Sequence, residues 1–326
     1  MIHWGFIGCG NVTEKKSGPA FRKVEESDIV AVMRRDAALA QDYATRHKIA
    51  RWYSDAYALI NDPSVDAVYI ATPPGSHDEY AVASMKAGKP VYVEKPMAAS
   101  SEACMAMARV AEETGVPCFV AYYRRTLPYF LRVRQLLESG EIGVASEVRI
   151  EFVIPPYPSD LNRETLSWRV KRELSGAGYF YDLASHQLDY LDFIFGEITE
   201  AHGTTANRAG LYDVEDTVDG RWLHSSGVKG RGHWEFAAPV KERTDTIEIL
   251  GSKGSIRFST FHFTPIVLNG VSGEKIFVEE NPDNIQFYLI QSIVNYLNGK
   301  GPYPVSDFRS ALRANRAMDM ILGRME

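Results

Sequence analysis

Cysteine is scarce in this sequence, which holds only Cys9, Cys104 and Cys118 among its 326 residues. Because their number is odd and they lie far apart, they predict neither a disulfide framework nor a metal-binding pair, and they favour a reducing compartment. The eight histidines are scattered without the spacing of metal ligands, which argues against metal catalysis. The N-terminal segment is interrupted by glycine too early for a secretory leader. These absences predict a cytoplasmic protein without a metal.

Long runs of one chemical character are also missing. No apolar stretch approaches the ~18 residues that a membrane span needs, and even residues 188–195 contain two aspartates. No basic run supplies the positive surface that nucleic acids require, and the formal net charge is −6. We find no internal repeat or low-complexity segment. Membranes and nucleic acids are therefore not expected partners.

The patterns that are present change character near residue 122. Before it, helical patterns separate short β-rich segments at 2–7, 28–33, 66–71, 90–94 and 117–122. This alternation predicts a doubly wound parallel sheet. After it, a helix is expected at 128–139 and alternating runs that indicate antiparallel strands lie at 146–154, 228–236 and 246–250. Further helices are expected at 182–195, 285–297 and 307–322.

The length of the chain exceeds what a single hydrophobic core usually supports, so two domains are expected. We predict an α/β fold in which residues 1–122 form a dinucleotide-binding Rossmann domain. Residues 123–326 are expected to form an α+β domain for substrate binding and oligomerisation. The irregular stretch 159–172 is expected to cover substrate.

A glycine turn directly follows the first predicted strand. Gly8 permits a tight turn, and Gly10 lets backbone amides approach a pyrophosphate at the start of a helix. The turn predicts dinucleotide binding by Gly8, Gly10, Asn11 and Val12. The third glycine of the usual fingerprint is missing, because position 13 is Thr13. An ordinary strand-to-helix turn is therefore the structural alternative.

The acidic residue that usually follows the second strand of an NAD-binding domain is also absent. Arg34 and Arg35 stand there instead. A guanidinium matches a 2′-phosphate in charge and in fork geometry, so we expect NADP(H) to be preferred, with NAD(H) possible as a second cofactor. A solvated basic pair is the alternative.

Two later strand ends add candidates at the carboxyl edge of the same sheet, where open α/β sheets bind ligands. Thr72 and Pro73, with His77 after them, are expected to line the cofactor, although the prolines could simply stop a strand. Glu94 and Lys95 end another strand. A lysine here would lie near the nicotinamide, so Lys95 is the first catalytic candidate.

A glycine-rich segment at 176–186 supplies the second catalytic group. Asp182 and His186 are spaced i, i+4, so the carboxylate could orient the imidazole and stabilise its charged form. A helix ion pair or an N-terminal cap is the structural alternative. Polyols need directional hydrogen bonds beside flat apolar faces. The residues expected to recognise the substrate are Arg124, Trp168, Arg169, Tyr179, Asp182 and His186. Trp168 could equally be core and Arg169 a surface ion pair.

The order and spacing of these segments resemble the glucose–fructose oxidoreductase and inositol dehydrogenase family (Gfo/Idh/MocA) over nearly the whole chain. The resemblance rests on Gly8-Cys9-Gly10-Asn11, Ala71-Thr72-Pro73 with His77, Glu94-Lys95-Pro96, Tyr123-Arg124-Arg125 with Pro128, residues 178–186 and Gly251-Ser252-Lys253-Gly254-Ser255. It implies that the second domain has a large open, mostly antiparallel sheet whose exposed face joins subunits into a homodimer or homotetramer. It also implies that Lys95, Asp182 and His186 form the catalytic group.

The activity expected from this resemblance is hydride transfer between a nicotinamide and a carbonyl or hydroxyl of a sugar, polyol or related small molecule. His186 would exchange a proton with the substrate oxygen, Asp182 would orient His186, and Lys95 would polarise the reacting oxygen. Two alternatives stay open. One is a non-catalytic NADP(H)- or sugar-sensing regulator on the same fold, and the other is glycoside cleavage with only transient use of the cofactor. The fold does not identify the substrate.

Overall fold

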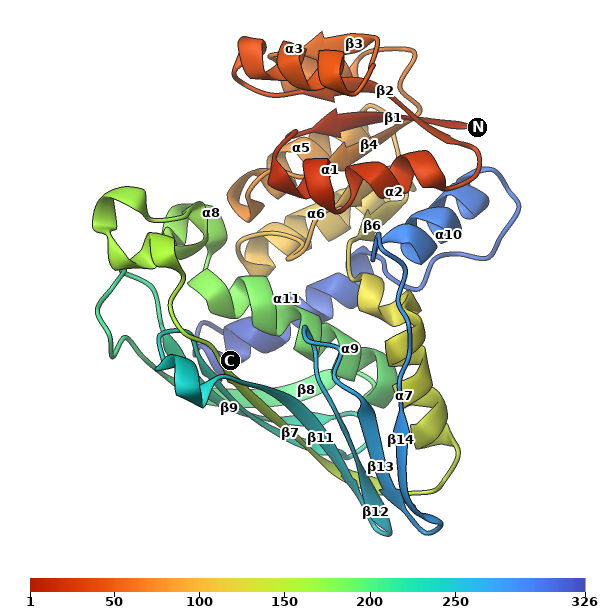
Figure 1. The fold of residues 1–326 in the computed structure, drawn as a ribbon. Coiled ribbons are helices and arrows are strands. Elements are labelled where there is room, and N and C mark those ends of the chain that lie inside the picture. Colours follow the sequence, from red (N-terminus) through yellow and green to blue (C-terminus); the bar gives the residue numbers. More distant parts are fainter. Residues whose placement is uncertain (326) are drawn as a thin grey trace. The chain divides into compact units, whose positions relative to one another are not determined.

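The computed structural model describes residues 1–325, and the chain divides into two compact units (Figure 1). Unit 1 comprises residues 1–126 and 282–312, and unit 2 comprises 127–281 and the segment from Arg313 onward. The chain passes from unit 1 to unit 2 after residue 126, whereas the expected boundary followed residue 122. Residues 282–312, which were expected in the second domain, group with unit 1.

Buried hydrogen bonds explain this return of the chain to unit 1. The Tyr92 hydroxyl donates to Gln286 Oε1 at 2.8 Å, and Gln286 Nε2 donates to Glu94 Oε1 at 2.7 Å. Gln286 is 2% exposed. Since buried polar groups must be paired, residues 282–312 complete the interior beside the fifth strand.

Unit 1 contains a six-stranded parallel sheet with the order β3-β2-β1-β4-β5-β6. The strands are β1 (Ile2–Ile7), β2 (Ser27–Met33), β3 (Arg51–Tyr53), β4 (Ala67–Ile70), β5 (Val91–Val93) and β6 (Cys118–Val120). The helices are α1 (Asn11–Lys15), α2 (Gly18–Lys23), α3 (Ala37–Arg46), α4 (Ala56–Ile60), α5 (His77–Lys86), α6 (Ser101–Thr114) and α10 (Phe287–Leu297). This is the doubly wound order, with its switch point between β1 and β4.

The sequence of unit 1 favours this sheet because its central strands are apolar throughout. Every residue of β4 and β5 is fully buried, as expected for parallel strands covered on both faces. The sequence analysis missed β3, which has only three residues and carries two exposed side chains, Arg51 and Trp52, at the edge of the sheet.

Unit 2 contains an eight-stranded sheet with the order β14-β13-β12-β11-β7-β10-β9-β8. The strands are β7 (Ala145–Val153), β8 (Ile198–Ala206), β9 (Thr217–His224), β10 (Lys229–Glu235), β11 (Thr244–Gly251), β12 (Gly254–Phe258), β13 (Ile266–Gly270) and β14 (Gly273–Phe277). The helices are α7 (Pro128–Glu138), α8 (Arg172–Ser175) and α9 (Ser185–Phe195), and α11 (Phe308–Ile321) starts in unit 1 and continues into unit 2. Neighbouring strands are antiparallel except β7 and β10, which run parallel. The predicted α/β class and mostly antiparallel second sheet are confirmed.

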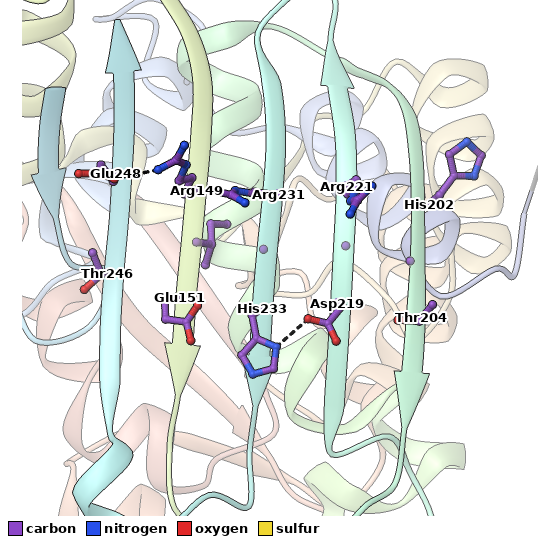
Figure 2. Close-up of a pocket in the computed structure, with 14 residues that line it drawn as sticks. Arg149, Glu151, His202, Thr204, Asp219, Arg221, Arg231, His233, Thr246 and Glu248 are labelled. Atoms are coloured by element: carbon purple, nitrogen blue, oxygen red, sulfur yellow. Dashed lines mark hydrogen bonds and ion pairs between the residues drawn. The ribbon is translucent and has the colours of Figure 1, made fainter. Parts of the chain in front are cut away.

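The two faces of this sheet differ sharply in character. Helices α7 and α9 lie over one face (Figure 1), and the Trp234 indole on that face donates to Gln187 of α9 at 2.6 Å. The opposite face is polar. Figure 2 shows its polar side chains. A hollow of about 820 Å³ on this face is lined by residues of five neighbouring strands. Among residues 1–325, no helix is both long and apolar enough to cross a membrane.

A histidine on this outer face predicts a pH-dependent stability. His233 Nδ1 lies 2.7 Å from Asp219 (Figure 2), and its Nε2 lies 3.5 Å from Glu235. Partial burial lowers the pKa of His233, but Asp219, Glu151 and Glu235 outweigh this and raise the pKa overall. Protonated His233 therefore stabilises the fold fully below its ordinary pKa of about 6.5, and this stabilisation is lost as the pH rises through the folded-state pKa.

We expect His233→Gln to remove that part of the pH dependence, which should amount to about 1 kcal/mol or less for a partly exposed pair. Urea unfolding measured from pH 6 to pH 9 checks this. His202→Gln is the control, because His202 lies on the same face and has no ion pair among the residues described. An unchanged pH profile in His233→Gln would contradict the assignment.

Candidate active site

The glycine turn of unit 1 lies between β1 and α1 and has the geometry that a dinucleotide requires. Gly8 has φ +93°, and a Cβ on it would lie 2.9 Å from the backbone of Ala71 and of Thr72. A Cβ on Gly10 would meet nothing within 4 Å, and no side chain caps the start of α1 there. The turn thus leaves open space beside uncapped backbone N–H groups, which suits a pyrophosphate.

The missing third glycine is explained by the packing of Thr13. The Thr13 hydroxyl donates to the Gly10 carbonyl at 2.9 Å, and the Tyr43 hydroxyl donates to the Thr13 carbonyl at 3.1 Å. The close backbone contact that requires a glycine occurs at Gly18 instead, where a Cβ would lie 2.0 Å from the Thr13 carbonyl oxygen. The sequence analysis missed Gly18, although its position just before Pro19 was a usable signal.

The two arginines that follow β2 are exposed. Arg34 Nη1 donates to the Cys9 carbonyl at 3.1 Å, so its guanidinium lies beside the glycine turn. The next acidic residue, Asp36, accepts a hydrogen bond from Leu39 N at 3.1 Å and caps α3. The Asp36 carboxylate therefore caps α3, and the charged group nearest to the end of β2 is the Arg34 guanidinium.

His77 is buried between two loops at the carboxyl edge of the sheet and is 1% exposed. Its Nε2 lies 2.7 Å from the Thr72 carbonyl and its Nδ1 lies 3.1 Å from the Pro96 carbonyl. Burial lowers the pKa of His77, against the opposing effect of these carbonyls. His77 therefore ties the end of β4 to the segment that follows Lys95.

The Glu94 carboxylate fixes the backbone on the other side of Lys95. It accepts hydrogen bonds from the Tyr69 hydroxyl at 2.6 Å and from Gln286 at 2.7 Å. The Lys95–Pro96 peptide bond is cis. Hydrogen bonds of Glu94 and His77 therefore hold the backbone on both sides of Lys95. The Lys95 side chain itself is only partly buried.

The remaining unit 1 candidates lie just after β6, on the turn Tyr123–Thr126. Arg124 is 2% exposed, and its guanidinium lies 5.1 Å from the centre of the Tyr123 ring. Arg125 Nη1 donates to the Val305 carbonyl at 3.1 Å. Unit 1 therefore brings the candidates that follow β1, β2, β4, β5 and β6 to one edge of its sheet, as the parallel topology requires.

In unit 2, Asp182 and His186 lie on one continuous helical segment, but not on a regular α-helix. Residues Phe180–Ala184 form a π-helical turn that leads into α9. Such turns are rare and are often found at functional sites. His186 is 2% exposed, and its ring centre lies 6.0 Å from that of Phe261.

Asp182 has an ionic partner that the sequence analysis did not foresee. Arg169 Nε donates to Asp182 Oδ2 at 2.8 Å, and the Arg169 guanidinium lies 4.6 Å from the centre of the Trp168 ring. The neighbouring charge of Asp182 raises the pKa of Arg169 against the effect of burial. Arg169 was expected to contact substrate, and no spacing rule could reveal a pair that is thirteen residues apart.

Two further residues, Asp319 and Arg324, hold the π-helical turn in place. The Tyr181 hydroxyl donates to Asp319 of α11 in a short hydrogen bond. The Arg324 guanidinium lies 5.9 Å from the centre of the Tyr181 ring and donates to the Gly176 carbonyl at 3.4 Å. Asp319 and Arg324 thus support the helical segment that carries Asp182.

Tyr179 is occupied by a hydrogen bond within the protein. Its hydroxyl lies 2.9 Å from both carboxylate oxygens of Asp160, and the side chain is 2% exposed. Burial and this carboxylate raise the pKa of Tyr179 far above its ordinary value. The ring also packs against Tyr157, with centres 5.1 Å apart. Tyr179 and Asp160 therefore anchor residues 158–170, which form three short 3₁₀ turns within and beside the predicted irregular stretch 159–172, to the segment before the π-helical turn.

Comparisons with known proteins agree with this architecture. Residues 2–122 match the model of an oxidoreductase family with an NAD-binding Rossmann fold, and residues 130–257 match the GFO/IDH/MocA C-terminal domain. The chain is 37% identical over 324 residues to "Oxidoreductase P35" of Formosa agariphila, covering 99% of this chain and 98% of that protein. It is 29% identical over 260 residues to a 1,5-anhydro-D-fructose reductase of Ensifer adhaerens, covering 78% and 75% of the two chains.

Solved structures show the same fold. A levoglucosan dehydrogenase in complex with NADH and L-sorbose superposes with a TM-score of 0.87 at 22% identity, covering 99% of this chain and 96% of that one. An oxidoreductase from Agrobacterium radiobacter in complex with NAD+, L-tartaric acid and magnesium superposes with a TM-score of 0.86 at 23% identity, with 99% and 96% covered.

Proposed function

Because this chain belongs to the Gfo/Idh/MocA family of oxidoreductases with an NAD-binding Rossmann domain, we propose that it transfers hydride between NADP(H) and a sugar, polyol or related small molecule. The observation that carries the proposal is the Gly8 turn, which leaves open space beside uncapped backbone N–H groups at the start of α1. Unit 1 presents Lys95 from a backbone braced by Glu94 and His77, and unit 2 presents Asp182 and His186 on one helical segment.

The cofactor would be held by the carboxyl edge of the unit 1 sheet. Gly8, Gly10, Asn11 and Val12 would bind the pyrophosphate through backbone N–H groups. Arg34 and Arg35 would bind the 2′-phosphate of NADP(H), and NAD(H) is the alternative cofactor. Thr72, Pro73, Glu94 and Lys95 would line the nicotinamide end, with His77 holding those loops in place. The bound nicotinamide supplies the hydride chemistry.

The protein side chains would stabilise the charge that develops on the substrate oxygen and transfer its proton. Lys95 donates a hydrogen bond to the reacting oxygen and stabilises negative charge that develops there. His186 takes up or returns the proton. Asp182, which is paired with Arg169, would support the charged form of the imidazole. Arg124, Trp168 and Arg169 would contact the rest of the substrate, and Tyr179 would act through Asp160 by shaping the segment around them.

The proposal is tested by NADPH consumption with a panel of aldoses, sugar ketones and inosones, beside a titration of cofactor binding. Turnover of at least one member supports an oxidoreductase. Cofactor binding without turnover on any member would favour the alternative of a regulatory, NADP(H)- or sugar-sensing binding protein. Release of sugar from a glycoside without net change in the cofactor would favour transient cofactor use.

We further propose that the outer face of the unit 2 sheet joins subunits into a homodimer or homotetramer. Its charges alternate in sign, with Arg149 and Arg231 paired to Glu147 at 2.8 and 3.0 Å, and Arg149 lying 3.8 Å from Glu248 (Figure 2). A face with interspersed charges of both signs can complement a second copy of itself. Sedimentation equilibrium tests this, and a monomer at micromolar concentration would contradict it.

A further inference from the structure

The hollow on the outer face of the unit 2 sheet is lined by two rows of charged side chains that cross the strands (Figure 2). The first row, called the basic row below, consists of Arg221 on β9, Arg231 on β10 and Arg149 on β7. Arg231 is directly opposite Arg221 in one neighbouring strand and directly opposite Arg149 in the other. Like charges in such positions repel each other. The basic row therefore calls for negative charge from outside it.

The second row lies two residues away along the same three strands (Figure 2). It consists of Asp219 on β9, His233 on β10 and Glu151 on β7, and His233 is directly opposite both carboxylates. The Asp219 side chain is 51% exposed although it lies 2.7 Å from His233, and Glu151 is exposed as well. We call this the acidic row, because it holds two carboxylates and one histidine.

Each row contains one charge that has no ionic partner in its own chain. Glu147 forms ion pairs with Arg149 and Arg231 at 2.8 and 3.0 Å. In the part of the chain that the structure describes, Arg221 forms no ion pair and no side-chain hydrogen bond, and the same is true of Glu151. Both side chains are exposed and line the hollow. The outer face thus presents an unpaired cation in one row and an unpaired anion in the other.

A second copy of the chain is the partner that matches both rows at once. A polyanion would suit the basic row but would also meet the acidic row two residues away. In a contact with two-fold symmetry, each surface meets the same surface of the other copy. A two-fold axis parallel to the strands would place each row over itself, guanidinium against guanidinium. A two-fold axis that crosses the strands between the rows places each basic row over the acidic row of the other copy, which is the complementary arrangement.

We propose that two copies of the chain pack through this face about a two-fold axis that crosses the strands between the basic row and the acidic row. This inference rests on the proposed oligomer and deepens it by naming the side chains that meet across the contact. Because symmetry repeats every contact, each pair occurs twice in the dimer. The pairs between the two copies are Arg221 with Asp219, Arg149 with Glu151 and Arg231 with His233.

Reversal of charge at Arg221 and at Asp219 tests the proposal, because the two substitutions compensate each other only in this arrangement. Arg221→Glu brings two carboxylates together at both symmetric contacts, and Asp219→Arg brings two guanidiniums together there. Each variant alone should raise the dissociation constant of the subunits about 10²-fold or more, since like charges held together in an interface repel strongly. Sedimentation equilibrium of each purified protein measures this constant.

Mixing the two variants should restore the assembly. The acid introduced at position 221 of one copy then meets the base introduced at position 219 of the other, while the second contact keeps its natural pair. With one variant labelled with ¹⁵N, native mass spectrometry should show more mixed assemblies than assemblies of either variant alone. The double variant Arg221→Glu/Asp219→Arg reverses both contacts and should assemble about as tightly as the wild-type protein.

Lys253→Glu is the matched control, because Lys253 is an exposed cation of the same unit in the turn between β11 and β12 and does not line the hollow. It should leave the dissociation constant unchanged. Thermal unfolding shows whether each variant is folded. If Arg221→Glu does not fold, Arg221→Gln, which only removes the charge, should still raise the constant about tenfold. An unchanged constant in the Arg221 variant, an equal loss in Lys253→Glu or no excess of mixed assemblies would each overturn the proposed pairing.

The same measurements separate this inference from the proposed function. A wild-type oligomer that tolerates both charge reversals keeps the proposed oligomer but overturns the pairing of the rows, and a wild-type monomer overturns both. Neither result touches hydride transfer, which the turnover of sugars with NADPH tests separately. An assembly that follows the predicted pairs but turns over no substrate supports the interface and counts against the proposed catalysis.

Discussion

Replacing Lys95 by methionine is expected to lower kcat about 10²-fold or more while the dissociation constant of NADPH changes by less than about threefold. Methionine keeps an unbranched apolar stem but removes the only charged donor of that side chain. The Glu94 carboxylate keeps its hydrogen bonds from Tyr69 and Gln286, so the backbone on which the residue stands should persist. Steady-state turnover and a fluorescence titration of NADPH measure the two quantities.

His186→Asn should produce a loss of similar size, because it removes the group that exchanges the proton. Lys86→Met is the control, since Lys86 is an exposed lysine at the end of α5 in the same unit as Lys95. Near-normal turnover in both Lys95→Met and His186→Asn would remove these residues from the mechanism. A loss of NADPH binding equal to the loss of kcat would instead limit the role of Lys95 to its contact with the nicotinamide end of the cofactor.

Replacing Arg34 by aspartate is expected to shift the ratio of kcat/KM for NADPH over NADH by about 10²-fold or more towards NADH. The substitution removes a charge-assisted pair with the 2′-phosphate and places a like charge beside it. Aspartate at this position also supplies the acceptor that a ribose 2′-hydroxyl prefers. Kinetics with both cofactors at a fixed substrate concentration measure the shift.

Arg34→Gln separates the charge of this residue from its support of the glycine turn. Glutamine retains a donor for the Cys9 carbonyl, which Arg34 Nη1 contacts at 3.1 Å, but it loses the charge. We expect an intermediate shift in cofactor preference with unchanged thermal stability. A wild-type protein that already prefers NADH would contradict the NADP(H) assignment, whatever the variants show.

Much of unit 1 could be predicted from local sequence because its information is local. Residues that suit ligand binding follow β1, β2, β4 and β5. Because these strands are parallel, their carboxyl ends lie at the same edge of the sheet. The positions of the Gly8 turn, Arg34 and Lys95 at this edge of the sheet could therefore be predicted from the sequence, and their roles stay predictions. The π-helical turn at Phe180–Ala184 could not be predicted, because the apolar periodicity of residues 182–195 is also that of a regular α-helix.

What could not be predicted depends on partners that are distant in sequence. Arg169 meets Asp182 only after the stretch 158–170 has folded, and the Tyr179 hydroxyl is taken by Asp160, which lies nineteen residues earlier. The same holds for Gln286, whose buried amide meets Glu94 across 192 positions. Neither periodicity nor composition carries a signal for such hydrogen bonds.

Because residues 282–312 belong to unit 1, this unit can complete its fold only late in synthesis. During synthesis the first 126 residues leave the ribosome long before α10 exists, so the nucleotide-binding unit stays incomplete while unit 2 emerges. Until Gln286 arrives, the polar groups of Tyr92 and Glu94 lack a partner that they have in the finished protein. A gene fragment that stops at residue 126 should therefore yield an unstable nucleotide-binding unit. A fusion that joins residue 126 to residue 282 through a short linker should restore it.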